Sequence, residues 1–187
     1  MMTKDNEGPK GDGSGVSSAG DRGAASPAPP SESGAYLREL EHSFLEAMEA
    51  REAGRLDDAF KLIKSVIRVE PRLAEPRLEL AAICAERGDW DEAAEQVREA
   101  IEAIERGWRW MDNYSDDELI SFASNLLGEI LVRAGTEGDV SRWEDESLQA
   151  MWEEARRCFR RALEADPSNQ EAIRNLAGFH EDSKAPS

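Results

Sequence analysis

The chain repeats itself at an interval of 34 residues, and this repeat constrains the fold more than any other feature. From Ala35 onward, apolar residues recur three and four positions apart, which is typical of amphipathic helices. No stretch shows the alternating pattern of a strand, so we expect an all-α fold. Repeat units of this length stack because one unit cannot bury its apolar face alone. The residues that coincide after a shift of 34 are Gly54 with Gly88, Leu56 with Trp90, Asp57 with Asp91, Asp58 with Glu92, Ala59 with Ala93 and Val66 with Ala100.

The second unit contains the residues that a tight helix–turn–helix needs. Gly88 can adopt the left-handed conformation that ends a helix, and Asp89 can accept the free amide protons of the helix that follows. The small side chains of Ala81 and Ala93 let neighbouring helices approach. With the period of 34, this pattern resembles the tetratricopeptide repeat. The resemblance implies a right-handed superhelix of antiparallel helix pairs.

The resemblance divides residues 35–182 into three repeats and a capping helix. The first repeat has Glu46 where the family usually has Leu. The third repeat matches the second only around two insertions, Arg106–Ser115 before it and Thr136–Ser147 between its helices. The expected segments are a first repeat at about 40–73, a second at 74–107, a third at 116–167 and a capping helix at 168–180.

Three predicted helix starts match a capping box, in which a Ser hydroxyl and a Glu carboxylate satisfy each other's exposed helix amides. The second box predicts that the last helix of the third repeat begins near Arg142, earlier than the repeat requires. The three pairs are Ser115 with Glu118, Ser141 with Glu144 and Ser168 with Glu171.

The ends of the chain differ in composition from the repeats. Gly, Ser and Pro make up 17 of residues 1–34, which contain no aromatic residue. Such a segment buries too little apolar surface to offset its ordering entropy. We therefore predict a disordered tail at 1–34 and a disordered end at 183–187.

The charge and the cysteines exclude several classes of protein. With 23 basic and 40 acidic residues, the formal charge is −17, which disfavours nonspecific binding to nucleic acid or to anionic lipid. No apolar run approaches the roughly 20 residues of a membrane span, so we expect no membrane insertion. The start of the sequence lacks the apolar stretch of a secretory signal. Two isolated cysteines suit a reducing, cytoplasmic setting.

The sequence offers little material for catalysis. His42 and His180 lie near opposite ends of the array, and Cys84 and Cys158 are most simply small core residues. The acidic residues around Asp112 lack the spacing of a calcium loop and are typical of a helix start. We therefore expect no catalytic, cofactor or metal site, and a protein that is not an enzyme.

In the tetratricopeptide repeat family, the first helices of the repeats line a concave groove that holds a peptide or a partner helix. The resemblance implies that the groove is lined by Glu41, Phe44, Met48 and Glu52, by Glu75, Leu78, Glu79, Ala82 and Glu86, and by Phe122, Asn125, Glu129 and Arg133. The positions at which some family members clamp a heat-shock carboxylate tail read Phe44, Met48, Glu79, Phe122 and Leu126, so we expect no binding of such tails. An acidic groove with apolar residues suits a basic or amphipathic segment. The alternative is that its glutamates form an ordinary solvated face.

The two insertions are rich in aromatic residues. Trp108, Trp110 and Tyr114 lie in the first, while Trp143 and Trp152 lie in or beside the second. We expect the insertions to touch and form a satellite core. The alternative is that Trp108, Trp110 and Trp143 form a secondary surface that anchors a partner.

Two functions remain. The first is a noncatalytic scaffold, bacterial in style, that binds a peptide or helix of a cytoplasmic partner protein. The second is a dedicated chaperone resembling the tetratricopeptide repeat chaperones of type III secretion, which are similarly short and acidic. The tail at 1–34 lacks the helical arm of those chaperones, which favours the scaffold.

Overall fold

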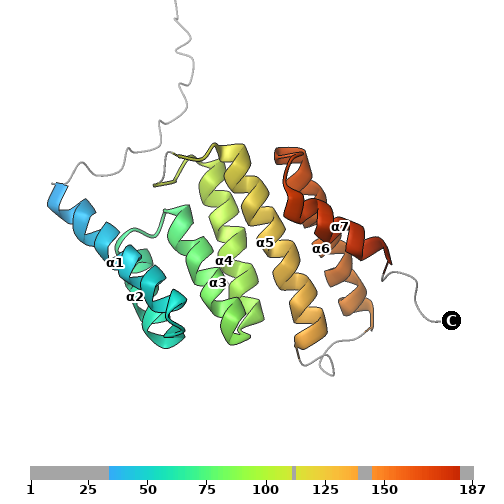
Figure 1. Ribbon diagram of the computed structural model, residues 1–187, viewed down its shortest axis with the longest axis horizontal. Helices are drawn as coiled ribbons and strands as arrows, with labels where there is room; N and C mark the ends of the chain where they lie inside the picture. The colour runs from blue at the N-terminus through green and yellow to red at the C-terminus, as the bar shows by residue number, and fades with distance from the viewer. Residues whose placement is uncertain (1–33, 111–112, 139–144, 182–187) are drawn as a thin grey trace, which may run out of the picture. The chain divides into compact units, whose positions relative to one another are not determined.

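The structure is a computed structural model that describes residues 34–110, 113–138 and 145–181. The predicted tail, apart from Gly34, and the predicted disordered end at 183–187 lie outside these residues. So do Trp143 and the capping box at Ser141. Within the described residues the chain forms seven α-helices and no strand, which confirms the predicted all-α fold (Figure 1). The helices are α1 (Gly34–Glu52), α2 (Leu56–Val69), α3 (Ala74–Arg87), α4 (Trp90–Glu105), α5 (Asp116–Glu137), α6 (Asp145–Ala165) and α7 (Gln170–Glu181).

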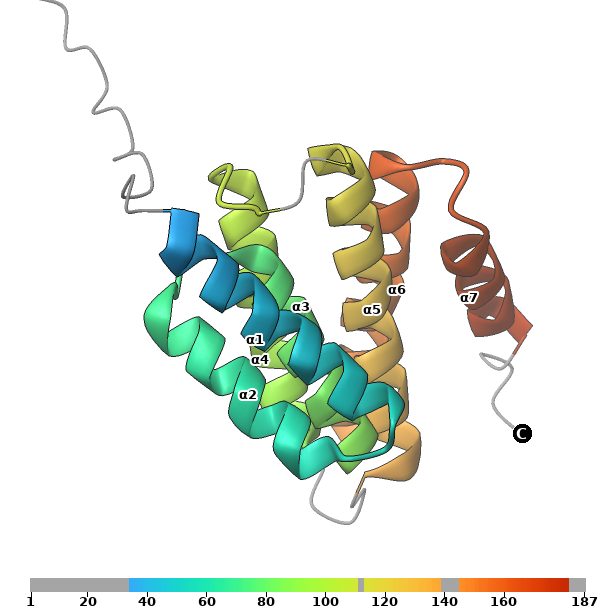
Figure 2. The same ribbon diagram turned by 60° about the vertical axis from the view of Figure 1, so that its left-hand side comes forward.

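The helices form successive antiparallel pairs, as the sequence predicts. α1 packs on α2, α3 on α4 and α5 on α6. The pairs stack in chain order through contacts of α2 with α3 and of α4 with α5, and Figure 2 shows this order from a second side. α7 closes the stack by packing mainly on α6, with a smaller contact to α5.

Small residues lie where the paired helices approach most closely. Ala59, Ala93 and Ala155 occupy the corresponding position of the second helix in each pair, and all three are fully buried. Between α5 and α6 the approach requires a glycine, because a Cβ atom added to Gly128 would lie 2.5 Å from the ring of Phe159. The register that the sequence predicts therefore places these residues in the core.

Glycine ends three of the helices in the left-handed conformation. Gly54, Gly88 and Gly107 follow α1, α3 and α4 with φ of 72°, 80° and 73°. The next N–H group bonds back into the helix, as in the 2.8 Å bond from Asp89 N to the Cys84 carbonyl. This arrangement satisfies carbonyl groups that the helix end leaves free. The prediction for Gly88 is confirmed.

The helix starts agree only in part with the predicted caps. At α5, Ser115 and Glu118 form the predicted capping box. At α7 the prediction is wrong, because Ser168 bonds to Asp166 and the side chain of Asn169 accepts the free amides of the helix. Asn169 is one residue closer to the helix and can reach the amides directly.

The expected cap on α4 is also wrong. Asp89 makes no side-chain bond to the amides of α4. Its carboxylate instead accepts a 3.0 Å bond from the Arg87 guanidinium across the turn. A charged partner two residues away outcompetes the backbone amides.

Both insertions lie at the ends of α5. Arg106–Ser115 connects α4 to α5. The described ends of the second insertion belong to α5 and α6, which have 22 and 21 residues, against 14 in α3 and 16 in α4. None of the helices in the described part of the chain combines the length and hydropathy that crossing a membrane requires.

Candidate functional site

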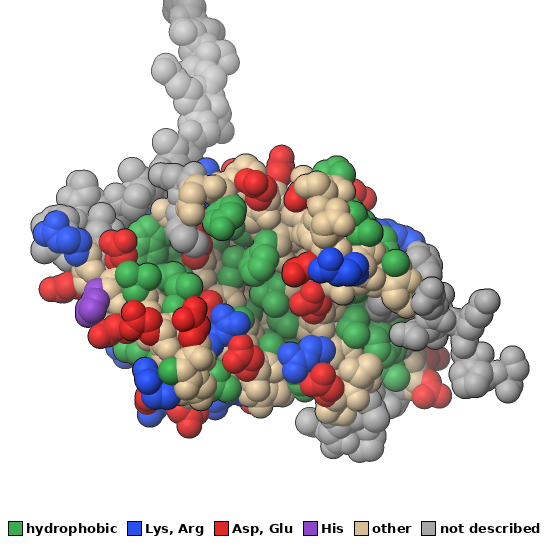
Figure 3. Space-filling view, viewed as in Figure 1, with side chains coloured by type: hydrophobic (Ala, Val, Ile, Leu, Met, Phe, Trp, Pro, Cys, Tyr) green, Lys and Arg blue, Asp and Glu red, His purple; other side chains and the backbone are tan. Residues whose placement is uncertain are grey.

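A groove of about 860 Å³ runs across the face formed by the first helices of the pairs. Its sides come from α1, α3 and α5, from the Arg106–Ser115 segment, and from residues 166 and 169 between α6 and α7. Figure 3 shows apolar side chains gathered across this face, with acidic side chains around them. We call this feature the concave groove.

The apolar surface of the concave groove is built by α1 and α3. Phe44 and Leu78 are buried in its floor, Met48 is half-buried, and Leu45 is 50% exposed. On α1, Phe44, Leu45 and Met48 are three and four positions apart or adjacent, so they share one side of the helix. An incoming apolar side chain would meet carbon atoms along this side.

The acidic residues of α3 are already engaged. Glu75 is only 4% exposed, and its Oε1 accepts a 2.7 Å bond from the Trp110 backbone N–H. The Arg51 guanidinium donates to both carboxylate oxygens of Glu79 at 3.0 and 3.2 Å, and to Glu86 at 2.7 Å. Burial acts to lower the pKa of Arg51, but its bonds to Glu86 and Glu79 outweigh this and hold the pKa above its ordinary value. Arg51 therefore neutralises much of the negative charge predicted for the α3 side of the concave groove.

The Arg106–Ser115 segment closes one end of the concave groove. The Ala74 N–H donates to the Trp108 carbonyl at 3.1 Å, which ties this segment to the start of α3. The ring of Trp110 lies 5.7 Å from the ring of Phe44 at an interplanar angle of 48°. These contacts join the insertion to the first two repeats, so Trp110 and Tyr114 become part of the groove wall.

The wall of the concave groove that faces the α1 and α3 surface is formed by one side of α5. Glu118, Phe122 and Leu126 are spaced four apart and all line the groove. Beside them lies Asp166, from the end of α6. The position of this segment is set by Asn169, whose amide donates to the buried Ser121 hydroxyl of α5 at 2.9 Å.

Two carboxyl groups of this wall stay ionised to a low pH. The pKa of Glu118 is lowered by the backbone N–H and then the hydroxyl of Ser115, while the nearby charge of Asp166 acts weakly in the other direction. The pKa of Asp166 is lowered by the hydroxyl and backbone N–H of Ser168. Both groups are therefore negative across the physiological range.

The structure brings together some of the predicted groove residues and not others. Glu52, Glu86, Asn125, Glu129 and Arg133 do not line the concave groove. Those that do line it are Glu41, Phe44, Met48, Glu75, Leu78, Glu79, Ala82 and Phe122.

The misplaced residues of α5 have other partners. Asn175 of α7 donates to the Asn125 side-chain carbonyl at 3.0 Å and to Glu129 at 2.7 Å, so these two residues hold the capping helix. Arg133 lies over the Trp90 ring at 4.8 Å and pairs with Glu137. The capping helix therefore covers part of the surface that the sequence assigns to the groove.

The expected satellite core does not form among the described residues. Trp110 lines the groove together with Glu118 from the start of α5, and Trp108 is bonded to the start of α3, whereas Trp152 and Leu148 lie against Gly135 near the end of α5. The 22 residues of α5 separate these two places by roughly 30 Å at 1.5 Å per residue. Trp152, which lies beside the second insertion, therefore does not meet Trp108 or Trp110, and Trp143 lies outside the described residues.

Sequence reasoning missed several residues of the concave groove, namely Leu45, Arg51, Trp110 as a groove residue, Tyr114, Glu118, Leu119, Ser121, Asp166 and Asn169. The interval of four residues between Glu118, Phe122 and Leu126 could have identified the side of α5 that lines the groove. No sequence signal places Asp166 near this side of α5, because the turn between α6 and α7 brings it there.

Among the described side chains, the remaining titratable groups show no arrangement for catalysis. His42 is exposed and pairs with Glu46 at 3.3 Å. Burial raises the pKa of both Cys84 and Cys158 to about 11, which keeps the thiols protonated. Among the residues whose placement is described, no group of three or more His, Cys, Asp or Glu is arranged to hold a metal ion. The concave groove offers apolar contact, aromatic rings and carboxylates, which together suit binding.

Two sequence models described as tetratricopeptide repeat match the chain, one over residues 50–109 and one over 149–186. No curated protein sequence matches it.

Several solved structures share the fold. The first tetratricopeptide repeat domain of Spaghetti (RPAP3), bound to the HSP90 peptide SRMEEVD, covers 78% of this chain and 94% of its own, with 16% identity and a TM-score of 0.57. The N-terminal domain of stress-induced protein-1 from C. elegans covers 79% and 99%, with 16% identity and a TM-score of 0.59. A mutant O-GlcNAc transferase from Thermobaculum terrenum covers 81% of this chain but 24% of its own, with 19% identity and a TM-score of 0.59. At these identities the likeness shows the fold alone.

Proposed function

This chain belongs to the tetratricopeptide repeat family, and from that premise we propose that it is a noncatalytic scaffold whose concave groove binds a segment of a partner protein. The family fold suggests protein–protein interaction in general. The finer assignment rests on one observation. Of the five large apolar residues that are exposed within the described chain, Leu45, Tyr114 and Phe122 all line this groove. Exposed apolar side chains gathered in one hollow are typical of an interaction site.

The charge of the concave groove supports a basic or amphipathic occupant. Five carboxylates line it, those of Glu41, Glu75, Glu79, Glu118 and Asp166, against the single guanidinium of Arg51. A segment that carries positive charge beside an apolar face would complement this surface.

The same charges argue against a heat-shock carboxylate tail. The neighbour bound to SRMEEVD holds a peptide with three acidic residues. In the concave groove, the one cation among the described lining residues is Arg51, which already pairs with Glu79 and Glu86. A free carboxylate would meet uncompensated negative charge there. We therefore infer that such tails are not the partner.

The noncatalytic assignment is compatible with the likeness to the O-GlcNAc transferase. That likeness covers only 24% of the enzyme, so the transferase activity does not carry over to this chain. Both cysteines are free thiols, which suits the reducing cytoplasm that we propose as its compartment.

The proposal is tested by selecting peptides from a displayed random library on the full chain. The selected peptides are then measured by fluorescence anisotropy on the wild type, on Phe122→Glu and on Ile173→Glu. Ile173 is an exposed apolar residue of α7 outside the groove, so its variant has the same charge change and serves as the control.

We expect the selected peptides to be basic and apolar, and Phe122→Glu to weaken them by at least about tenfold, as loss of a central aromatic anchor does. The added glutamate makes the groove more acidic, so attraction by charge alone would strengthen binding instead. Ile173→Glu should leave the affinity within about twofold. Equal binding to all three proteins would contradict the proposal, as would tight binding of SRMEEVD.

A further inference from the structure

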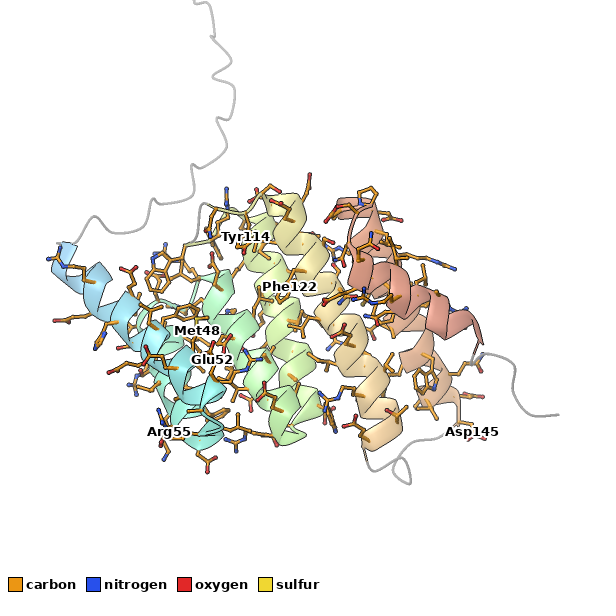
Figure 4. All side chains as sticks on the ribbon, viewed as in Figure 1. Met48, Glu52, Arg55, Tyr114, Phe122 and Asp145 are labelled. Atoms are coloured by element: carbon orange, nitrogen blue, oxygen red, sulfur yellow. The ribbon has the colours of Figure 1, made fainter. Side chains whose placement is uncertain are left out.

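The α5 end of the concave groove combines aromatic and acidic side chains. Tyr114 is 48% exposed and Phe122 is 51% exposed. Figure 4 shows Tyr114 beside the start of α5 and Phe122 farther along the helix, on the same face of the molecule. Glu118 and Phe122 are four residues apart on α5 and lie on one side of it, and Tyr114, which precedes the helix, lines the same groove. Asp166 completes the set from the end of α6.

Among the residues whose placement is described, the two carboxylates of this set have no cationic partner. Within the described chain, no Lys or Arg forms an ion pair with Glu118 or Asp166. Their only bonds are to Ser115 and Ser168, which come from neighbouring backbone. By contrast, Glu79 in the same groove already pairs with Arg51. The acidity still available to a partner therefore lies at the α5 end.

These carboxylates are held in place before any partner arrives. The capping box keeps Glu118 against the start of α5. The bond from Asn169 to Ser121 fixes the turn that carries Asp166 against the same helix. Arg109 further ties the approach to α5, because its guanidinium donates to the Tyr114 carbonyl at 2.6 Å and lies 2.8 Å from the Asp116 carboxylate. A site with this little freedom loses little entropy on binding.

The chain uses the same combination to hold one of its own arginines. The Arg133 guanidinium lies 4.8 Å from the centre of the Trp90 ring and donates two bonds of 3.1 Å to the two oxygens of Glu137. An aromatic ring beside a carboxylate suits a guanidinium. The planar group stacks its face on the ring while the N–H groups at its edge donate to the carboxylate. Lysine can also lie over a ring and pair with a carboxylate, as Lys64 does with Phe60 and Glu92, but it lacks the planar fork that stacks and donates two parallel bonds.

We propose that Tyr114, Glu118, Phe122 and Asp166 form a receptor for an arginine side chain of the partner segment. This inference rests on the proposed function, and it adds the orientation of the partner segment in the concave groove. The apolar face of the partner lies on Phe44, Met48 and Leu78, and its arginine reaches the α5 end of the concave groove. Glu79 does not select the partner, since Arg51 occupies its charge.

The test uses synthetic 16-residue amphipathic peptides with leucine on one helical face and glutamine on the other. One glutamine near either end is replaced by arginine, lysine or glutamate, and each peptide carries a fluorescein label. Affinities are measured by anisotropy on the full chain, on Glu118→Gln/Asp166→Asn and on a matched control, Glu95→Gln/Glu153→Gln. The control removes two exposed carboxylates of α4 and α6 that do not line the groove, so both double variants lose two negative charges. Gln and Asn keep the acceptors for Ser115 and Ser168, and a urea midpoint checks that each variant is folded.

We expect an arginine at one end to bind the wild type about fivefold more tightly than glutamine there, with lysine intermediate and glutamate weakest. Glu118→Gln/Asp166→Asn should reduce that preference to less than about twofold, leave the all-glutamine peptide unchanged and spare the dependence on Phe122. The control should keep the preference. The inference is overturned if the preference survives Glu118→Gln/Asp166→Asn, or if the control abolishes it equally. Binding that depends on Phe122 but not on arginine would leave the proposed function standing, whereas the absence of any Phe122-dependent binding would refute both.

Discussion

Gly128 provides a direct test of the packing between α5 and α6. A Cβ atom at this position would lie 2.5 Å from one atom of the Phe159 ring and 2.8 Å from two others, about 0.9 Å short of the ordinary contact distance of 3.4 Å. Phe159 is buried, so its ring has little room to recede. Gly128→Ala should therefore strain the contact between the helices.

The expected cost combines two opposing effects. Overpacking of this kind costs about 1 to 3 kcal/mol, and replacing a helical glycine with alanine returns up to about 1 kcal/mol. We expect a net loss of about 1 kcal/mol in the free energy of unfolding. With a urea m-value of about 2 kcal/mol/M, this moves the midpoint down by about 0.5 M.

The matched control is Gly178→Ala in α7, where an added Cβ would meet nothing within 4 Å. This variant should be neutral or more stable by up to about 1 kcal/mol, because only the helix propensity changes. Both are measured by urea denaturation followed by far-ultraviolet circular dichroism. A third protein, Gly128→Ala in a Phe159→Leu background, should show a coupling of at least about 0.5 kcal/mol, since the smaller side chain leaves space.

A Gly128→Ala protein as stable as the Gly178→Ala control would refute this reasoning. It would mean that α5 and α6 lie farther apart, or that the Phe159 ring moves freely. Additivity between Gly128→Ala and Phe159→Leu would show that the two side chains do not touch.

Three further outcomes follow from the structure. Ala93→Leu should lower the free energy of unfolding by about 1 to 3 kcal/mol, because Ala93 of α4 is fully buried; an unchanged urea midpoint would place it at the surface. Ser115→Ala should raise the pKa of Glu118 toward its ordinary 4.5, as followed by NMR titration of the carboxyl carbon. Since folding lowers this pKa, its contribution to stability is present above pH 4.5 and is lost as the pH falls through the folded value, so Ser115→Ala should flatten that part of the acid-unfolding curve. With a pKa of about 11, Cys158 should react with a thiol reagent at pH 8 about 100-fold more slowly than a thiol of pKa 9.0, and a rate equal to that of a free thiol would show that the side chain is not shielded.

The sequence alone determined the stack of helix pairs. Helix formation and the buried face of each helix depend on the spacing of apolar residues along the chain. A period of 34 residues repeats that spacing, so each repeat forms the same pair of helices. Gly88 ends a helix because of its own backbone freedom, and Ala93 is buried because its position in the repeat admits no larger side chain. The family resemblance predicted some groove residues of α1 and α3, such as Phe44 and Leu78, whereas Glu52 and Glu86 of the same helices do not line the groove.

Only the tertiary structure decided which side chains are still available in the concave groove. Arg51 and Glu79 are 28 residues apart, and whether they pair depends on how two repeats stack. The position of α7 removed Asn125 and Glu129 from the groove, and the turn at Asp166 added a carboxylate that no helical spacing could place. Long polar side chains and turns take whichever partner the assembled surface brings within reach, so their roles depend on three-dimensional distances that a period in the sequence does not contain.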